Sequence, residues 1–248
     1  MDVHSNYLKN KNVLITGGGS GMGRAIAIKM AQYGAHTAIC GRRKEALSKT
    51  VDLANEGLCP LQNITDVTDR KSVTKLFEWV DEKLGNLDIL VHAAGLNICN
   101  RTMQELSPED WDLLINTNLT GSFNILKPAL QRMRKLRKGL IILINSVAGK
   151  RATPLAGIGY NSSKFGMTAL GVGVGEEEKE NGIRITNIYP GEVNTDILDQ
   201  RKMPPDQSHR SSILQPVDIA SIVVNLATLP DHVHVPELVV KPTQQSFV

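Results

Sequence analysis

The sequence predicts an α/β fold: a doubly wound, mostly parallel sheet of about seven strands with helices on both faces. Short apolar runs alternate along the chain with longer segments of helical periodicity, which is typical of sheets built from β-α-β units. One run, Leu140–Ile144, is apolar at every position, as expected for a strand buried on both faces. We expect the 248 residues, 1–248, to form a single domain.

The expected strands are short and are followed by turn residues. They span residues Asn12–Thr16, Ala35–Cys40, Leu58–Ile64, Leu87–His92, Leu140–Ile144, Ile183–Tyr189 and Leu238–Val240. The expected helices span residues Arg24–Ala31, Lys44–Asn55, Arg70–Leu84, a long segment from Pro108 to about Lys138, Tyr160–Glu180 and Gln215–Leu229. Asp69 and Ser107 are the expected N-caps of the third and fourth helices, and Pro128 is expected to kink the fourth.

Composition and charge argue against several classes of protein. The hydrophobic fraction is 41% and the charged fraction 21%, as in globular domains. A net charge of +3 is too small to indicate nucleic acid or a membrane surface as a partner. No apolar run approaches the ~18 residues that would cross a membrane, and the short segment before the first strand leaves no room for a signal peptide. Three scattered cysteines predict free thiols, no metal site and a cytoplasmic protein.

A glycine-rich loop follows the first strand and leads into a helix. It contains Gly17, Ser20, Gly21, Met22 and Gly23. Glycine permits positive φ angles and close approach of the backbone, and a helix N-terminus offers free N–H groups to a pyrophosphate. The loop reads T-G-x-x-x-G-x-G rather than G-x-G-x-x-G. We interpret it as a dinucleotide-binding loop; a plain glycine-rich β-α turn is the alternative.

The end of the second strand bears on the choice of cofactor. Dinucleotide folds that bind NAD place an acidic residue there, on the ribose 2′-hydroxyl. Here the strand leads into Arg42 and Arg43, whose forked donors suit a 2′-phosphate. We therefore predict NADP(H) rather than NAD. The alternative is that the two arginines simply open a surface helix.

Two further turns are expected at the same edge of the sheet. Asp66 and Val67 follow the third strand, where Asp66 could hydrogen-bond an adenine amino group or cap the next helix. Ala93, Ala94 and Gly95 follow the fourth strand, and their small size would let a ribose or a flat ring lie close to the backbone. Both turns are therefore expected to line the cofactor site.

Ser146, Tyr160 and Lys164 are spaced so that they can converge on one point. Ser146 follows the buried fifth strand, while Tyr160 and Lys164 lie four residues apart at the start of a helix and share one face. An unperturbed tyrosine has a pKa of about 10, and a nearby Lys164 cation is expected to lower it. Tyr160 could then exchange a proton with an alcohol or ketone oxygen that Ser146 positions. Taken alone, the three could also be ordinary polar residues at element ends.

Taken together, these residues resemble the short-chain dehydrogenase/reductase family in its single-domain form, over about residues 11–243. The glycine loop, the Asp66–Val67 pair and the Ala93–Gly95 turn match the family's cofactor motifs. The family's catalytic tetrad is matched in order and spacing by Asn118, Ser146, Tyr160 and Lys164. The segment that holds the nicotinamide carboxamide in the family corresponds to a turn containing Pro190, Gly191, Val193 and Thr195.

The resemblance implies a Rossmann fold, an NADP-dependent oxidoreductase and a role for each member of the tetrad. Tyr160 would be the acid/base. Lys164 would hold the nicotinamide ribose and lower the pKa of Tyr160, so both residues would also contact the cofactor. Ser146 would orient the substrate carbonyl, and Asn118 would hold a water in a proton relay behind Lys164.

Several positions depart from the family pattern. His92 stands where asparagine is usual, and we interpret it as a structural histidine that hydrogen-bonds across the sheet; an additional acid is the alternative. Tyr189 replaces a smaller polar residue, and the common V-D-G-G ending is missing. Gly171, Gly173 and Gly175 lie inside the helix of Tyr160, which indicates either close packing, for example at a subunit interface, or a loosened helix.

The predicted function is the interconversion of a ketone or aldehyde and an alcohol by hydride transfer with NADP(H). One alternative is a 3-oxoacyl-acyl-carrier-protein reductase, for which the basic run 132–138 could dock an acidic carrier protein. Another is a reductase of small hydroxy acids or sugars. The alternative from another class is a non-catalytic nucleotide-binding protein.

The partner is expected to be a small carbonyl or alcohol substrate. Its expected contacts are Ser146, Ala148, Tyr160 and Glu192, with Leu96 and Asn97 nearby and a mobile substrate lid over about residues 192–213. These residues mix polar and apolar groups and select no particular substrate. In relatives of the family that the chain resembles, two long helices of this type usually pair between subunits, which implies a homodimer or homotetramer.

Overall fold

The computed structural model describes residues 7–54 and 59–246. Within them, seven parallel strands form one sheet in the order β3-β2-β1-β4-β5-β6-β7. The strands are β1 (Asn12–Thr16), β2 (His36–Gly41), β3 (Leu61–Ile64), β4 (Ile89–His92), β5 (Gly139–Ile144), β6 (Ile183–Pro190) and β7 (Glu237–Val240). The chain order reverses between β1 and β4, so the sheet is doubly wound and of the Rossmann type, which confirms the predicted fold class.

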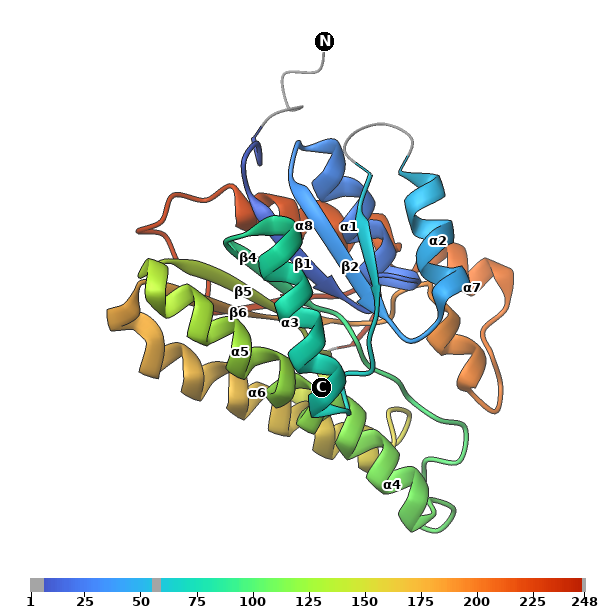
Figure 1. Cartoon of the computed structure of the whole chain (residues 1–248). Coiled ribbons are helices and arrows are strands. Elements are labelled where there is room, and N and C mark those ends of the chain that lie inside the picture. The colour runs from blue at the N-terminus through green and yellow to red at the C-terminus, as the bar shows by residue number, and fades with distance from the viewer. Residues whose placement is uncertain (1–6, 55–58, 247–248) are drawn as a thin grey trace.

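Helices cover both faces of the sheet (Figure 1). One face carries α1 (Gly21–Gln32), α2 (Lys44–Leu53) and α8 (Pro216–Ala227), and the other carries α3 (Arg70–Leu84), α5 (Gly121–Leu136) and α6 (Ile158–Glu178). The shorter elements are α4 (Pro108–Ile115), η1 (Asn116–Thr120), η2 (Val147–Gly149), η3 (Lys179–Asn181), η4 (Asp196–Gln200) and α7 (Gln207–Ser212). No helix in the described ranges is long and apolar enough to cross a membrane.

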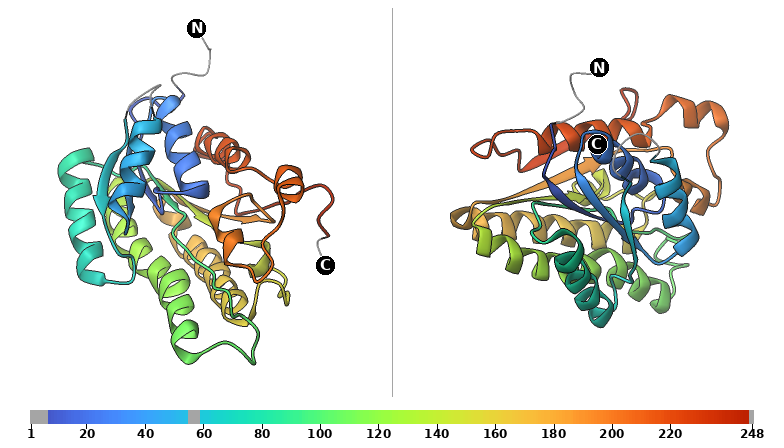
Figure 2. Two further views of the ribbon diagram at one scale, coloured as in Figure 1. Left: turned by 90° about the vertical axis from the view of Figure 1, so that its right-hand side faces the viewer. Right: turned by 45° about the horizontal axis from the view of Figure 1, so that its top comes forward.

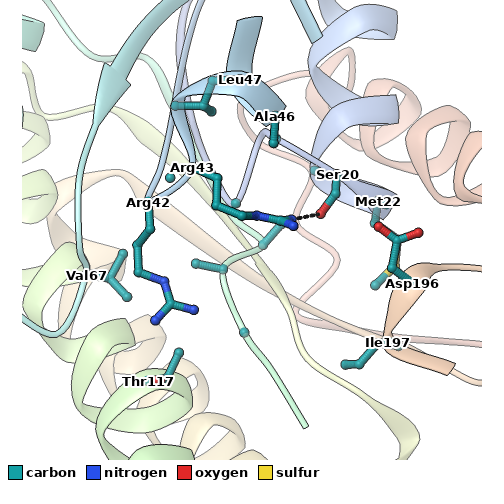
Figure 3. A pocket seen from close by; sticks show the side chains of 18 of the residues that line it. Ser20, Met22, Arg42, Arg43, Ala46, Leu47, Val67, Thr117, Asp196 and Ile197 are labelled. Carbon is teal, nitrogen blue, oxygen red and sulfur yellow. Dashed lines mark hydrogen bonds between the residues drawn. The ribbon is translucent and has the colours of Figure 1, made fainter. Parts of the chain in front are cut away.

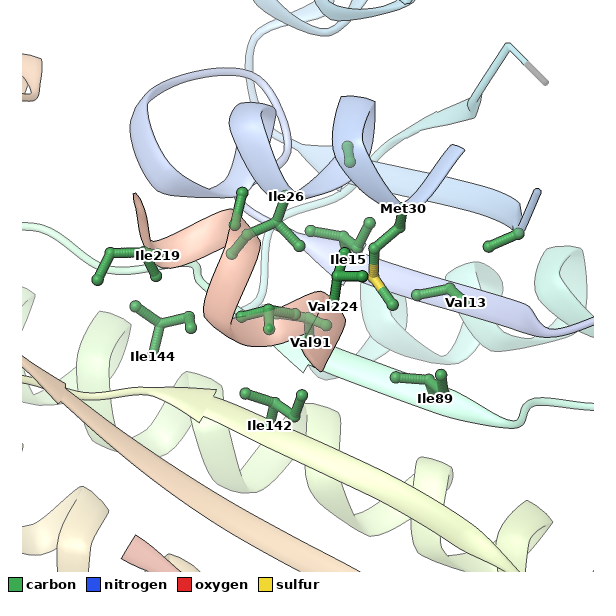
Figure 4. Packing of buried hydrophobic residues seen from close by; sticks show 14 of the residues in the cluster. Val13, Ile15, Ile26, Met30, Ile89, Val91, Ile142, Ile144, Ile219 and Val224 are labelled. Atoms are coloured by element: carbon green, nitrogen blue, oxygen red, sulfur yellow. The ribbon is translucent and has the colours of Figure 1, made fainter. Parts of the chain in front are cut away.

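Two apolar cores hold these layers together, because successive side chains of a strand point to opposite faces. Val13 and Ile15 of β1 pack toward α1 and α8, whereas Leu14 packs toward α3 and α5. β4 and β5 alternate in the same way, and Figure 4 shows the first core between the sheet and the helices carrying Ile26 and Val224. Each fully buried aliphatic side chain contributes about 1.5–3 kcal/mol, so the central strands form a rigid support for the loops at their ends.

Most predicted elements are confirmed, with small shifts at their ends. Asp69 caps α3 by accepting the Lys71 N–H at 2.9 Å, and Ser107 caps α4 by accepting the Asp110 N–H at 3.1 Å. α6 begins two residues early, at Ile158, because Gly157 with φ of 85° sets its boundary. The long fourth helix is interrupted by a π-helical turn, η1, which the sequence did not predict. The predicted ends at residues 55 and 58 lie outside the described residues.

The basic segment 132–138 at the end of α5 is largely engaged within the chain. Arg132 pairs with Asp81 at 2.5 Å, Arg134 with the buried Glu178, and Lys138 with Asp231. Arg137 donates to the Glu180 carbonyl at 2.6 Å. These contacts tie α5 to α3, η3 and the loop before β7, so the run is more than a solvated last turn.

All strands end at the same edge of the sheet, and the loops that follow them gather there. After β6 the chain leaves the sheet through residues 191–213, which include η4 and α7. Figure 2 shows this segment in orange beside the red C-terminal residues. The two are linked by the Glu192 N–H, which donates to the Gln245 side-chain oxygen at 2.9 Å.

Candidate active site

The glycine loop after β1 is held with its carbonyl groups turned into the protein. Thr50 of α2 donates to the Gly18 carbonyl at 2.8 Å, and Arg24 of α1 donates to the Gly19 carbonyl and to Thr50. Gly17 and Gly21 have φ of 68° and 50°, which L side chains rarely adopt. The loop therefore leads into the free N–H groups of α1 in a shape that suits an anion.

A cavity of about 220 Å³ opens at this loop and follows the strand ends. It is lined by the predicted residues Gly17, Ser20, Gly21, Met22, Gly23, Arg42, Arg43, Asp66, Val67, Ala93, Ala94, Gly95 and Thr195. The lining residues that the sequence did not single out include Gly41, Ala46, Leu47, Thr65 and Thr117; Asp196 and Ile197 were expected only as part of the lid. A glycine-lined cavity at a helix N-terminus fits a dinucleotide.

Arg42 and Arg43 enter this cavity from the turn after β2 (Figure 3). Arg43 donates to the Ser20 hydroxyl at 3.4 Å, and neither arginine forms an ion pair in the described part of the chain. Asp66, also in the lining, accepts the Thr68 N–H at 2.9 Å and its hydroxyl at 2.8 Å. The β2 end of the cavity is thus rich in cationic donors.

A second cavity, of about 150 Å³, continues from the first. The two share Met22, Thr195 and Ile197, and the second is lined by all four expected substrate contacts, Ser146, Ala148, Tyr160 and Glu192, and by Pro190, Gly191 and Val193. Asn97 lines it as expected, but Leu96 does not. Arg101, Leu155, Ala156 and Gln245 also line it, and no motif in the sequence pointed to them.

Ser146, Tyr160 and Lys164 converge between these cavities, as their spacing predicted. The Ser146 hydroxyl lies near enough to the Tyr160 phenol to lower the pKa of that phenol. Lys164 is buried, with its ammonium 5.7 Å from the centre of the Tyr160 ring and 3.1 Å from the Ile144 carbonyl, which accepts a hydrogen bond. A Cβ at Gly95 would lie 3.2 Å from the Asn118 side-chain oxygen and 3.8 Å from this ammonium, so Gly95 lies beside both residues.

The pKa of Tyr160 differs from the sequence expectation. Burial raises it, and the hydrogen bond from Ser146 and the positive charge of Arg101 only partly oppose that effect. Lys164 is not among the groups that lower it in this structure. Burial also lowers the pKa of Lys164 to about 8, because desolvation disfavours a charged ammonium. Arg101, which the sequence did not single out, is the cation that favours the phenolate.

Asn118 lies in the π-helical turn and is fully buried. Its side-chain oxygen accepts the Leu96 N–H at 2.9 Å, and its amide donates to the Leu96 carbonyl at 3.0 Å and to Ser163 at 3.1 Å. These bonds fasten the loop after β4 to α6. Neither Asn118 nor Lys164 lines either cavity. π-Helical turns often mark functional sites, and this one places Asn118 beside the loop of Gly95.

His92 is a buried, hydrogen-bonded histidine. Its Nδ1 lies 2.8 Å from the Thr16 hydroxyl and its Nε2 3.0 Å from the Ser122 hydroxyl. Burial lowers its pKa to about 3, and the charge of Lys164 adds to this effect, so the imidazole is neutral. This favours the structural interpretation of His92 over that of an additional acid.

The predicted lid segment contributes to both cavities. Ile197 lines both, and Leu198 and Arg201 line the second. Glu192 accepts from Arg201 at 2.6 Å and contacts His209 at 2.8 Å, so its carboxylate is engaged within the segment. The lid is therefore a folded part of the cavity wall in this structure.

Comparison with known proteins agrees with this geometry. Residues 11–205 match the family model for short chain dehydrogenases. A glycine betaine reductase of Emericella nidulans is 32% identical over 96% of this chain, which spans 19% of that protein. An uncharacterised oxidoreductase of Staphylococcus aureus is 32% identical over 95% of this chain and 98% of that protein.

Solved structures share the fold at full length. An alcohol dehydrogenase from the archaeon Thermococcus sibiricus, in complex with 5-hydroxy-NADP, superposes with a TM-score of 0.85 at 29% identity, over 95% of this chain and 98% of that one. The chain therefore belongs to the short-chain dehydrogenase family of oxidoreductases.

Proposed function

We propose that this oxidoreductase interconverts a ketone or aldehyde and an alcohol with NADP(H), with Tyr160 as the acid/base. The observation that carries the proposal is the position of Tyr160, which lines the second cavity together with Ser146. Lys164 lies behind its ring. A carbonyl oxygen in the second cavity could therefore reach a proton donor beside the cofactor cavity.

Each residue of the site has a distinct task in this reaction. The nicotinamide cofactor supplies or accepts the hydride at the carbonyl carbon when bound. Ser146 positions the substrate oxygen, and Tyr160 donates its proton to that oxygen in reduction and takes it back in oxidation. Arg101 and the Ser146 hydroxyl favour the phenolate that is left. Lys164 holds the nicotinamide ribose, while Asn118 fixes the loop after β4 and holds the water of the proposed relay. Reduction thus adds one hydride and one proton to the carbonyl group.

The preference for NADP(H) over NAD(H) is part of the proposal. It is supported by Arg42 and Arg43, two cations without ion pairs in the described residues, at the end of the cavity next to β2. Forked guanidinium donors bind a phosphate well and gain little from a bare hydroxyl. The solved relative in complex with an NADP derivative adds support.

Two alternatives receive less support. A 3-oxoacyl-carrier reductase would need a basic docking patch, and Arg132, Arg134 and Lys138 are each paired with a carboxylate of this chain. A non-catalytic nucleotide-binding protein would have no evident need for Ser146, Tyr160 and Lys164 in this arrangement. A small hydroxy acid as substrate is favoured by a separate observation, developed below.

We also propose a homodimer or homotetramer in a reducing compartment such as the cytoplasm. α5 and α6 lie side by side on the face of the sheet that also carries α3 (Figure 1). Phe123 on α5 and Phe165 and Val172 on α6 are exposed. Such a surface suits pairing between subunits. Cys40, Cys59 and Cys99 are free thiols. A monomer by light scattering would contradict the assembly.

The direct test replaces the Tyr160 hydroxyl. We expect Tyr160→Phe to lower the rate of NADPH-dependent reduction of ketones and aldehydes by about 10²–10⁴-fold, because the proton donor is lost. NADPH affinity should stay close to that of the wild type. Tyr33→Phe, which lies just after α1 and lines neither cavity, is the matched control and should keep full activity.

Initial rates over a carbonyl panel and fluorescence titration of NADPH provide the two readouts. NADPH binding with no turnover of any carbonyl by the wild type would contradict the proposed reaction. Unchanged turnover in Tyr160→Phe would contradict the assignment of the acid/base.

A further inference from the structure

Two arginines from separate segments face the substrate cavity together with Tyr160. Arg101 lies in the loop between β4 and α4, and Arg201 follows η4 in the lid. They are close enough for the charge of Arg201 to lower the pKa of Arg101, an effect that adds to that of burial. Like charges held together at a half-buried site raise the free energy of the empty cavity, and a bound anion would relieve this repulsion.

Arg101 is held in place by backbone oxygens rather than by a carboxylate. It donates to the carbonyls of Leu155 at 3.2 Å, Gln200 at 2.7 Å and Cys99 at 3.4 Å. A guanidinium has five N–H donors, so two remain without a partner in the described residues. The side chain is thus fixed by its surroundings, keeps its full charge and retains donors for a ligand.

The charge balance of the cavity gives the charge of that ligand. Arg201 is paired with Glu192 at 2.6 Å, and the same carboxylate contacts His209 at 2.8 Å. Glu192 therefore offsets one of the two guanidinium charges that line the cavity, and about one positive charge is left at Arg101. A monoanion such as a carboxylate matches this excess, whereas a phosphate dianion would exceed it.

The volume of the cavity further narrows the choice of ligand. The cavity holds about 150 Å³, which is small beside the ~300–1,000 Å³ of typical ligand sites. Arg101 also lies near enough to Tyr160 for its charge to lower the pKa of the phenol. Because Arg101 and Tyr160 line the same small cavity, one small molecule carries both the anionic group and the reacting carbonyl.

We infer that the substrate is a small oxo acid, or the corresponding hydroxy acid, whose carboxylate is bound by Arg101 with Arg201 while its carbonyl oxygen meets Tyr160 and Ser146. This inference rests on the proposed function. The carboxylate is unchanged in the reaction. Reduction adds a hydride to the carbonyl carbon and the Tyr160 proton to the oxygen, and the hydroxy acid is the product.

The test compares acids with neutral analogues of nearly the same shape. We would measure kcat/KM with NADPH for 2-oxobutanoate and 4-oxopentanoate and for their methyl esters. The enzymes are wild type, Arg101→Gln, Arg101→Lys and the control Arg151→Gln. Arg151 is exposed, lies in the neighbouring loop and does not line the cavity, so its variant makes the same charge change away from the site.

We expect the wild type to prefer at least one acid over its ester, and Arg101→Gln to lower kcat/KM for that acid by about 10–10²-fold, as for a lost charged hydrogen bond. The ester should change far less. Arg101→Lys should recover part of the acid activity, and Arg151→Gln should behave as the wild type. Because the acid-to-ester ratio is taken within each variant, a general loss of folded enzyme does not change it.

Failure of the inference is distinguishable from failure of the proposed function. Reduction of the esters or other neutral ketones at equal or higher kcat/KM than the acids would overturn the carboxylate site and leave the carbonyl reductase standing. An equal loss of kcat/KM for acid and ester in Arg101→Gln would likewise overturn the carboxylate site and leave the carbonyl reductase standing. No turnover of any carbonyl, with NADPH bound, would overturn both.

Discussion

At the scale of single residues, His92 connects the site to the sheet through hydrogen bonds. Ser122 donates its proton to the Asn118 carbonyl at 2.6 Å, so the His92 Nε2 must donate to Ser122 and its Nδ1 must accept from Thr16. Thr16 in turn accepts the Ala93 and Ala94 N–H groups at 3.2 Å. The neutral ring therefore links the ends of β1 and β4 to the turn that carries Asn118.

This network predicts a particular sensitivity to acid. The unfolded chain protonates His92 below about pH 6.5, and the folded chain does so only near pH 3. Between these values the unfolded state binds the extra proton. The contribution of the neutral His92 to the free energy of unfolding is therefore fully present above pH 6.5 and is lost as the pH falls, by up to ~1.4 kcal/mol per pH unit. The free energy of unfolding of His92→Asn, measured in urea at pH 7, 6 and 5, should lack this part of the dependence on pH.

His36→Asn, at an exposed position of β2, is the matched control, and its free energy of unfolding should depend on pH as that of the wild type does. If His92→Asn and His36→Asn lose stability with acid equally, His92 is not the group responsible.

The sequence could indicate the polar residues of the site but not their protonation. The positions of Ser146, Tyr160 and Lys164 follow from a strand end and a helical spacing of four, both of which are local patterns. The expected lowering of the Tyr160 pKa by Lys164 was wrong for this structure, because burial and Arg101 depend on how separate loops pack. No local pattern contains that information.

At the scale of elements, α6 carries three interior glycines in different surroundings. A side chain at Gly171 would lie 2.5–2.6 Å from the polar atoms of Asn187 in β6, so close packing explains this glycine. Gly173 is exposed with nothing within 4 Å, and a side chain at Gly175 would make an ordinary contact with Ile185. The sequence prediction of close packing thus holds at one of the three positions, and helix periodicity alone could not tell which.

The paired substitutions Gly171→Ala and Gly173→Ala separate these cases. We expect Gly171→Ala to destabilise the protein by about 1–3 kcal/mol, because the added methyl group would collide with the buried Asn187. Gly173→Ala should stabilise by up to ~1 kcal/mol, because alanine favours the helix and meets no neighbour. Urea unfolding measures both, and light scattering checks that assembly is unchanged. Shifts of the same sign would contradict this explanation.

At the scale of the whole molecule, the parallel sheet brings sequence segments far apart to one edge. The doubly wound order and nearly every strand could be predicted, because apolar runs and turn residues are local signals. The π-helical turn and the contribution of Arg101 could not, because they depend on contacts between α4, α6 and the loops. The first cavity is lined by most of the residues expected to bind the cofactor, since its loops follow strand ends, whereas residues from the lid and C-terminus complete the second cavity through tertiary packing.

The most direct measurement is the affinity for NADPH against NADH, by fluorescence titration of the wild type, Arg42→Ala and the control Arg151→Gln. We predict tighter binding of NADPH by the wild type and by the control. In Arg42→Ala, NADPH affinity should fall by about tenfold or more, with NADH affinity little changed, because only the 2′-phosphate loses a charged partner. Equal affinity for both cofactors, or equal losses in the variant, would contradict an NADP(H)-dependent site at this end of the cavity.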